Sequence, residues 1–168
     1  INSKKKSQSE LSDLFPTHTF IPEDLYISKG SPKKRRTLVN RHIGQLDTDY
    51  DNLLTQYNSE LKKKNTLLKK NELNKEFLEV LEERLVDLGA EIIQKRANYL
   101  EDLNERLPEV YGRFVQNDAK LSLNYVDEIL MNSSREDLVE YLSDRIEENR
   151  QKELEQETTV VGPHRDKF

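Results

Sequence analysis

Apolar residues recur at helical spacing through most of this 168-residue chain. From residue 47 to about residue 71 they return every three or four positions, which predicts one amphipathic helix. Asp47 and Thr48 are its candidate N-caps, and lysines gather toward its end, where cations suit the helix dipole. Roughly 25 residues at 1.5 Å each would form a rod of about 37 Å. The apolar positions of this helix are Tyr50, Leu54, Tyr57, Leu61 and Leu68.

A second, longer apolar stripe follows a polar break near residues 71–74. Its members are Leu81, Leu85, Leu88, Ile92, Tyr99, Leu103, Leu107, Val110 and Phe114. Pro108 interrupts this stripe, and a proline at such a place predicts either a kink or the start of a new helix. The two stripes together predict a long antiparallel helical hairpin, similar to a coiled coil because few apolar residues lie outside its seam.

Two shorter helices are predicted on either side of the hairpin. One begins at about residue 32, where Ser31 and Pro32 make a good N-cap and first helical residue, and ends near residue 44. The other runs over about residues 134–154 and is preceded by a candidate capping box of Ser133, Ser134 and Glu136.

Three short strands are predicted near the two ends of the chain. Residues 17–21 and 120–126 alternate apolar and polar side chains, and residues 158–161 form a β-branched run that Gly162 and Pro163 stop. The predicted fold is therefore mainly α. A long helical arm leaves and returns to a body that contains a few β-strands.

Composition narrows the classes of protein to which the chain can belong. Hydrophobic residues make up 34% and charged residues 35%, as expected for long amphipathic helices with one buried stripe. Without cysteine there is no disulfide, thiolate metal site or thiol nucleophile. No apolar run approaches the roughly 20 residues of a membrane span, so a cytoplasmic location is the expectation. The chain begins with Ile1 and its only methionine is Met131, which predicts a piece of a longer protein.

The charge is distributed unevenly around a net value of −5. Residues 1–41 carry nine Lys or Arg against four Asp or Glu, whereas residues 42–168 carry 18 against 28. A basic end on an acidic body indicates that any contact with a polyanion lies near the basic end. Solvated surface charge is the alternative.

Common catalytic motifs are absent from the sequence. It contains no G-x-x-x-x-G-K-[ST] phosphate loop, no G-x-G-x-x-G, no H-E-x-x-H and no G-x-S-x-G. The three histidines, His18, His42 and His164, stand far apart in different contexts, so they do not predict a zinc site. We expect no complete active site within these residues.

Four consecutive cations, Lys33, Lys34, Arg35 and Arg36, lie in the first turns of a predicted helix. Cations there oppose the helix dipole, so each costs a few tenths of a kcal/mol locally. Four such cations in a row favour an external ligand. Phosphates of DNA fit this role, because lysine supplies a point charge and arginine can make two parallel hydrogen bonds. Ion pairing with nearby acidic residues is the alternative. A second basic run, Lys4, Lys5 and Lys6, is a further candidate for DNA contact.

Two other short segments carry candidate chemistry. Glu23 and Asp24 follow the first predicted strand and could orient a metal-bound water or the Mg²⁺ of a nucleotide, or cap a short turn. His164, Arg165 and Asp166 follow the last predicted strand, at a place where α/β sheets bind ligands, although a surface turn is the alternative.

The two ends of the chain together resemble the RecF family of bacterial recombination-mediator ATPases, which are related to the SMC proteins. The likeness is carried by FIPEDLYISKGSPKKRR at 20–36, IGQ at 43–45, Y-N-x-x-L-K-x-x-N at 57–65 and VVGPHRD at 160–166. It runs over essentially the whole chain and is strongest over residues 20–68 and 158–166.

The resemblance implies an ABC-type ATPase head with an inserted helical arm. Residues 1–31 and 158–168 would then be parts of the head, 32–118 the arm, and 119–157 a strand and helix that return to the head. In this family an ATP-dependent homodimer clamps DNA at gaps or junctions of single-stranded and double-stranded DNA. It helps to load the recombinase together with recombination-mediator partner proteins.

The resemblance also implies a nucleotide site that these residues would complete only in part. The phosphate loop would lie upstream, and the signature motif and Walker B acid downstream, so ATP and Mg²⁺ belong to the full-length protein, a weak ATP hydrolase. Glu23 would stand at the position of the Q-loop glutamine beside the γ-phosphate and metal. Asp24, His164, Arg165 and Asp166 would lie near the nucleotide.

The chain departs from the family pattern at two positions. Asn40 stands where members usually have an aspartate after the arginine pair, and Lys167 stands where they usually have a second aspartate. Two alternatives stay open beside the DNA clamp. The hairpin could be a structural arm that binds a partner protein or a second subunit without DNA, or a free-standing coiled coil without nucleotide.

Overall fold

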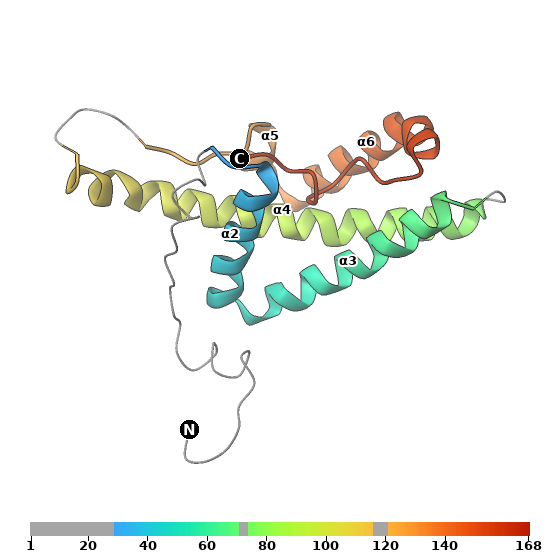
Figure 1. The fold of residues 1–168 in the computed structure, drawn as a ribbon, viewed down its shortest axis with the longest axis horizontal. Coiled ribbons are helices and arrows are strands. Elements are labelled where there is room, and N and C mark those ends of the chain that lie inside the picture. Colours follow the sequence, from blue (N-terminus) through green and yellow to red (C-terminus); the bar gives the residue numbers. More distant parts are fainter. Residues whose placement is uncertain (1–28, 71–73, 116–120) are drawn as a thin grey trace, which may run out of the picture.

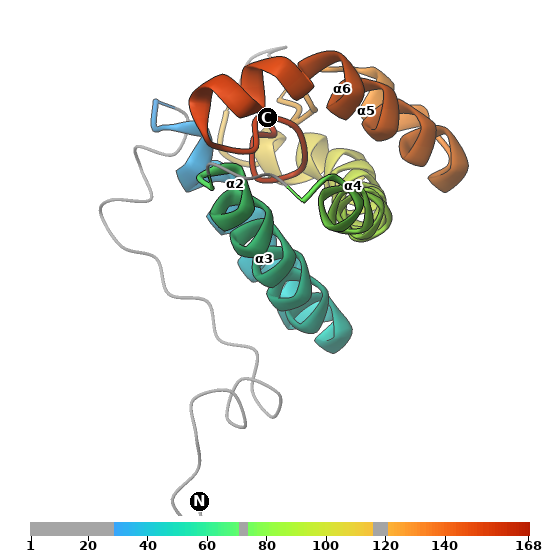
Figure 2. The same cartoon turned by 90° about the vertical axis from the view of Figure 1, so that its right-hand side faces the viewer.

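A computed structural model of the chain describes residues 29–70, 74–115 and 121–168. The helices in these ranges are α2 (Pro32–Leu46), α3 (Thr48–Leu68), α4 (Lys75–Gly112), α5 (Ile129–Asn132) and α6 (Arg135–Gln156). α4 is the central rod, with α3 antiparallel to it on one side and α6 on the other (Figures 1 and 2). α2 crosses the open end of the α3–α4 hairpin (Figure 1). The mainly α fold and its long antiparallel hairpin are confirmed.

Local sequence signals explain where the helices begin. Ser31 is the N-cap residue of α2 and Pro32 its first residue. The Asp47 carboxylate accepts a hydrogen bond from the backbone N–H of Asp49 and so caps α3. The capping box of α6 is formed by Ser134 and Asp137. The predicted box had Glu136 in the place of Asp137.

α4 continues through Pro108 to Gly112 as a single helix, so no new helix starts at that proline. The apolar stripe of α4 is buried only up to Leu100. Beyond that point the helix extends past its neighbours (Figure 1), and Val110 and Phe114 are 50% and 82% exposed. None of the described helices combines the length and apolar character needed to cross a membrane.

The main hydrophobic core lies along the middle of α4, between α3, α6 and the segment 158–168. Gly89 allows the close approach of these elements, because a Cβ atom there would lie 3.2 Å from Leu142 of α6 and 3.3 Å from Pro163. The buried apolar residues of α4 in this core are Leu85, Val86, Ala90, Ile92, Ile93, Ala97 and Leu100.

The predicted strands at 120–126 and 158–161 are wrong, since neither 121–126, the described part of the first, nor 158–161 is a strand. The strand predicted at 17–21 lies outside the described residues. A strand requires a neighbouring strand that binds its backbone groups. Here the N–H of Val126 donates to the carbonyl of Lys167 (2.9 Å), and helix side chains bind several of the other backbone groups. Asn104 of α4 accepts from the N–H of Leu123 (2.8 Å) and donates to its carbonyl (2.9 Å).

The segment 158–168 is bound in the same way. Asn65 of α3 accepts from the N–H of Thr159 (2.7 Å), and the Glu153 carboxylate of α6 accepts from the N–H of Val160 (2.7 Å). The β-branched pattern was a real sign of burial, because Thr159 is almost completely buried. The pattern did not indicate a sheet, because the segment packs against helices and not against strands. The partition into head and arm residues remains a prediction.

A buried cluster of charged residues joins α3, α4 and α6. The ammonium of Lys64, on α3, is fully buried and lies 3.1 Å from Glu82 of α4 and 2.6 Å from Glu153 of α6. Arg150 of α6 donates to the second oxygen of Glu82 at 2.7 Å. Two cations therefore balance two carboxylates, and these four residues are called the Lys64 cluster below. The ion pairs fix how the three helices stand relative to one another.

We predict that Lys64→Met lowers the free energy of unfolding by about 3–5 kcal/mol, because it leaves two buried carboxylates with one cation. Lys62→Met makes the same chemical change at an exposed position of the same helix, and its expected effect stays within about 0.5 kcal/mol. Urea unfolding followed by circular dichroism measures both. Equal destabilisation by the two substitutions would contradict this role of the Lys64 cluster.

Candidate functional site

Helices α2, α3 and α4 and the segment 158–168 meet around the guanidinium of Arg96, which is buried on α4. Its Nε and Nη2 donate to the side-chain oxygen of Asn40 at 3.1 and 2.9 Å. Its Nη1 donates to the carbonyl of Pro163 at 2.8 Å and to the carboxylate of Asp166 at 2.7 Å. The Tyr50 hydroxyl accepts from Nε at 3.1 Å and donates to Asn40 at 2.8 Å. These residues form the Arg96 network.

Asp166 is held at this place through both its side chain and its backbone. Burial raises the pKa of its carboxyl to about 6, and the guanidinium of Arg96 acts in the opposite direction. Arg36 of α2 donates to the backbone carbonyl of Asp166. The ring of Phe168 lies 5.9 Å from the Arg96 guanidinium and packs edge-to-face on Tyr125. The segment is thereby attached to both α2 and α4.

His164 is a partly buried, neutral imidazole. Its Nε2 lies 3.2 Å from the carbonyl of Thr159, which can only accept, so Nε2 carries the proton. Its Nδ1 lies 2.8 Å from the Tyr57 hydroxyl and is therefore the acceptor. Burial first, and nearby cations second, lower the pKa of His164 to about 4. Gly162 makes the turn that precedes this residue, with φ at 123°, and a Cβ atom there would collide with the Tyr57 hydroxyl.

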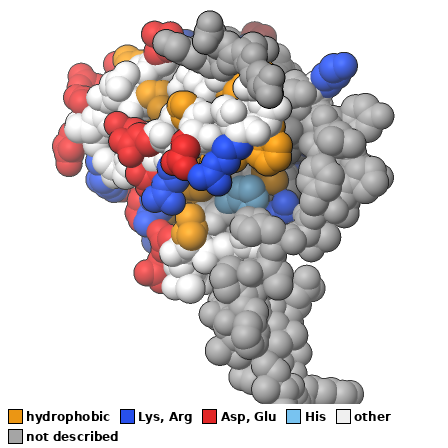
Figure 3. All heavy atoms as spheres, turned by 90° about the vertical axis from the view of Figure 1, so that its left-hand side faces the viewer, with side chains coloured by type: hydrophobic (Ala, Val, Ile, Leu, Met, Phe, Trp, Pro, Cys, Tyr) orange, Lys and Arg blue, Asp and Glu red, His pale blue; other side chains and the backbone are white. Residues whose placement is uncertain are grey.

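The four consecutive cations of α2 divide into outward and inward pairs. Lys33 and Lys34 are exposed. Arg35 donates to the carbonyl of Gly30 at 2.7 Å, and Arg36 reaches Asp166. Each of these arginines donates to a backbone carbonyl, and Glu23 and Asp24, the nearby acids that could pair with them, lie outside the described residues. Acidic and basic side chains lie next to one another on the face drawn in Figure 3.

The structure brings the cations of α2 and the residues around His164 to one pocket of about 370 Å³. This is called the α2–His164 pocket below. Its charged lining residues are all cations, namely Lys33, Arg36 and Arg96. The other lining residues are Thr37, Asn40, Leu54, Tyr57, Asn58, Ile92, Pro163 and His164. A pocket with this lining favours an anion.

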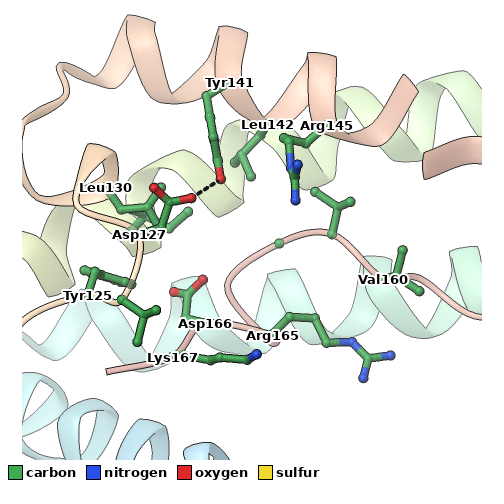
Figure 4. Close-up of a pocket in the computed structure, with 14 residues that line it drawn as sticks. Tyr125, Asp127, Leu130, Tyr141, Leu142, Arg145, Val160, Arg165, Asp166 and Lys167 are labelled. Atoms are coloured by element: carbon green, nitrogen blue, oxygen red, sulfur yellow. Dashed lines mark hydrogen bonds between the residues drawn. The ribbon is translucent and has the colours of Figure 1, made fainter. Parts of the chain in front are cut away.

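A second pocket, of about 270 Å³, lies on the other side of the segment 158–168. Figure 4 shows Tyr141 and Arg145 of α6 facing Arg165 and Asp166 across it. The Tyr141 hydroxyl donates to Asp127 at 2.7 Å. Cations and carboxylates both line this pocket, so its charge selects no particular ligand.

The described residues do not by themselves fit a nucleotide or Mg²⁺. His164 and Asp166 use their polar atoms for contacts within the protein, and only Arg165 of this trio is exposed. Among the described residues, no three or more His, Asp or Glu lie where they could hold a metal ion together. Glu23 and Asp24, and likewise Lys4, Lys5 and Lys6, lie outside the described residues.

Sequence reasoning missed the two buried cations, although the sequence carries a signal for each. Arg96 stands where the apolar stripe of α4 continues, between Ile92 and Leu100. Lys64 stands in the same way between Leu61 and Leu68 of α3. A charged residue at the apolar position of a helix indicates a buried ion pair, because an unpaired charge there would cost several kcal/mol.

Known proteins are similar to this chain in sequence and in fold. No protein-family model matches the chain. The chain is 33% identical over 170 residues to the DNA replication and repair protein RecF of Clostridium perfringens (strain SM101 / Type A). It is 35% identical over 170 residues to that of Clostridium acetobutylicum, and both alignments cover 100% of the chain. The chain is homologous to the RecF family.

The chain spans less than half of these RecF proteins, since each alignment covers 46% of the relative. Two solved RecF structures also share its fold. One, of the recombination mediator protein RecF-ATPrS in the RecFOR pathway, has a TM-score of 0.81, 32% identity, and covers 88% of this chain and 41% of that chain. The other, of RecF-ATP in the same pathway, has a TM-score of 0.79, 32% identity, and covers 88% and 40%. The resemblance to RecF is confirmed.

The neutral His164 predicts a pH dependence of stability. Because its pKa is about 4 in the folded protein and about 6.5 when unfolded, the unfolded chain binds a proton first as the pH falls. Below about pH 6.5 the His164 contribution to stability therefore decreases, by up to about 1.4 kcal/mol per pH unit until about pH 4. Asp166 acts oppositely, since its raised pKa adds stability as the pH falls below about 6.

The difference in unfolding free energy between wild type and His164→Gln isolates the histidine, because Asp166 is present in both. We expect the advantage of the wild type to shrink steadily from pH 7 to pH 4.5 in urea titrations. A pH-independent difference would show that His164 is not buried as a neutral group.

Proposed function

We propose that the protein carrying this chain is a recombination mediator whose ATP-dependent dimer clamps DNA at gaps or junctions of single-stranded and double-stranded DNA. In this function it helps to load the recombinase together with recombination-mediator partner proteins. The homology to RecF supports the class of protein, and the chain would supply its helical arm together with the segment 158–168. Because the chromosome of bacteria lies in the cytoplasm, the proposed function is a cytoplasmic one.

One observation in the chain itself carries the DNA-binding part of this proposal. Lys33 and Lys34 project from the first turn of α2, where no acidic residue balances them within the helix. Arg36 holds that turn against the segment 158–168, so the two lysines are presented from a fixed base. Preorganised cations of this kind favour binding to phosphates, because less side-chain and backbone freedom is lost when the ligand binds.

In this proposal, ATP and Mg²⁺ are bound by the longer protein that carries this chain. The described residues of this chain would contribute positioning, since the Arg96 network ties the segment 158–168 to α2. A nucleotide held by other residues would supply the energy for dimerisation. The contribution of this chain's own residues is to keep Lys33 and Lys34 at a fixed place relative to that segment.

The test is the double substitution Lys33→Gln and Lys34→Gln in the intact protein. Arg35 and Arg36 are left in place because they bind backbone carbonyls. We expect weaker binding to labelled gapped duplex DNA whatever its sequence, and a salt dependence of log K that is shallower by about 2. Fluorescence anisotropy across a salt series measures both quantities.

The matched control removes two exposed cations elsewhere, by Arg106→Gln and Lys152→Gln. This change alters the net charge equally but lies away from α2. If both variants shift the affinity and the salt slope to the same extent, or neither does, the cations of α2 are not a DNA site.

The structural-arm alternative has one observation in its favour. Val110 in the last turn of α4 and Phe114 just after its end are exposed, although the same apolar stripe is buried earlier in the helix, up to Leu100. An exposed apolar helix end of this kind is suited to a protein partner or a second subunit. If the cations of α2 prove irrelevant to DNA, this role of the arm is the one left.

A further inference from the structure

The α2–His164 pocket is the first of three neighbouring pockets along α3. It shares Asn58 with a second pocket of about 360 Å³, and the second shares Lys62 and Thr66 with a third of about 320 Å³. Asn58, Leu61, Lys62, Asn65, Thr66 and Lys69 line the second pocket. Ser59, Lys62, Lys63, Thr66, Leu67, Lys70 and Phe77 line the third. The second and third pockets therefore lie side by side over the same stretch of α3, and the first adjoins the second at Asn58, so that the three form one connected face.

The charge of this face is one-sided. None of the residues lining the three pockets is Asp or Glu, although the chain as a whole has a net charge of −5. The polar lining residues without charge are amides, hydroxyls and one imidazole. The amide N–H groups can donate hydrogen bonds to an anion, whereas the hydroxyls of Thr37, Tyr57 and Thr66 bind within the protein. Lysines near a helix C-terminus also suit the helix dipole, which accounts for Lys69 and Lys70. That effect does not extend to Lys62 or to Lys33 on another helix.

The lysines of this face differ in how their charge is balanced. Lys63 is paired with Glu60 at 2.8 Å, and Lys64 points inward to its own cluster. Lys62, Lys69 and Lys70 are exposed, and none of the carboxylates in the described ranges lies within ion-pair distance of them. Their positive charge is available to a ligand from outside.

The spacing of the polar positions suits an extended ligand better than a single small anion. Asn58, Lys62, Asn65 and Lys69 stand three or four residues apart and so lie on one side of the helix. At 1.5 Å per residue, the distance from Asn58 to Lys69 is about 16 Å along the axis. Because the phosphates of one strand advance by about 3.4 Å along the duplex axis and also wind around it, a face of this length can contact several of them.

We infer that this face, from Lys33 at the start of α2 to Lys69 and Lys70 at the end of α3, is a track that binds the phosphate backbone of one DNA strand. The inference rests on the proposed function, which supplies DNA as the polyanion. It extends the DNA contact from the first turn of α2 along the length of α3. The lysines bind phosphates as point charges, and the side-chain amides between them donate hydrogen bonds.

The experiment compares three variants of the intact protein on labelled gapped duplex DNA. The track variant carries Lys62→Gln, Lys69→Gln and Lys70→Gln, and the α2 variant carries Lys33→Gln and Lys34→Gln. The control carries Arg106→Gln, Arg113→Gln and Lys152→Gln, which remove three exposed cations elsewhere. All substituted side chains are exposed, so thermal unfolding is expected to be unchanged and verifies that each variant is folded.

We expect the track variant to lower the salt slope of log K by about 2 to 3 and the control to leave it unchanged. Acetylation of lysines, read by mass spectrometry, supplies a second measurement. DNA is expected to protect Lys62, Lys69 and Lys70 at least threefold more than Lys152. A track variant that behaves as the control does, with equal acetylation in the presence and absence of DNA, overturns the inference.

The outcomes separate this inference from the proposed function. If the α2 variant weakens DNA binding and the track variant does not, the DNA contact ends at α2 and only the α3 track is refuted. If neither variant differs from the control, both the track and the DNA-binding part of the proposed function are refuted.

Discussion

Two cations buried between the helices determine how this structure is arranged. Lys64 and Arg96 both stand at apolar positions of their helices, and a charge at such a place is tolerated only when it is paired. The partners come from other elements: Glu82 from α4 and Glu153 from α6 for Lys64, and Asp166 from the segment 158–168 for Arg96. Moving any of these elements away would leave a buried charge without its counter-ion. The segment 158–168 is therefore fixed without forming a strand.

The pairing of charges within the protein also determines which charged side chains remain available to a ligand. Arg36 is used to hold Asp166, and His164 is used by Tyr57 and Thr159. The lysines at the start of α2 and along the outer face of α3 are among the described groups whose charge is not used within the protein. A protein with a net charge of −5 thus presents a continuous face whose lining residues carry no carboxylate. The proposed DNA contact uses lysines that are not paired within the protein.

The sequence predicted the helices well and the segments 121–126 and 158–161 poorly, for one physical reason. Helical periodicity and caps such as Asp47 act locally, so the elements could be found from neighbouring residues. Whether a β-branched run such as 158–161 pairs with a strand depends on what lies beside it, and here Asn65 and Glu153 of two helices lie there. The candidate site was predicted in part. Arg36, His164 and Asp166 do meet, but Arg96, which joins them, was not recognised within its apolar stripe.

The central claim is that Arg96 holds α2 and the segment 158–168 together. Hydrogen–deuterium exchange of Arg96→Met, compared with Lys95→Met at the neighbouring and more exposed position, tests it most directly. We predict faster exchange of the amides of Thr159, Val160 and Arg165 in Arg96→Met only, while the amides of α6 stay protected. Those amides are bonded to Asn65, Glu153 and Gly162 and not to Arg96 itself, so their release would report the loss of the network. Unchanged protection of these amides in Arg96→Met would contradict the claim.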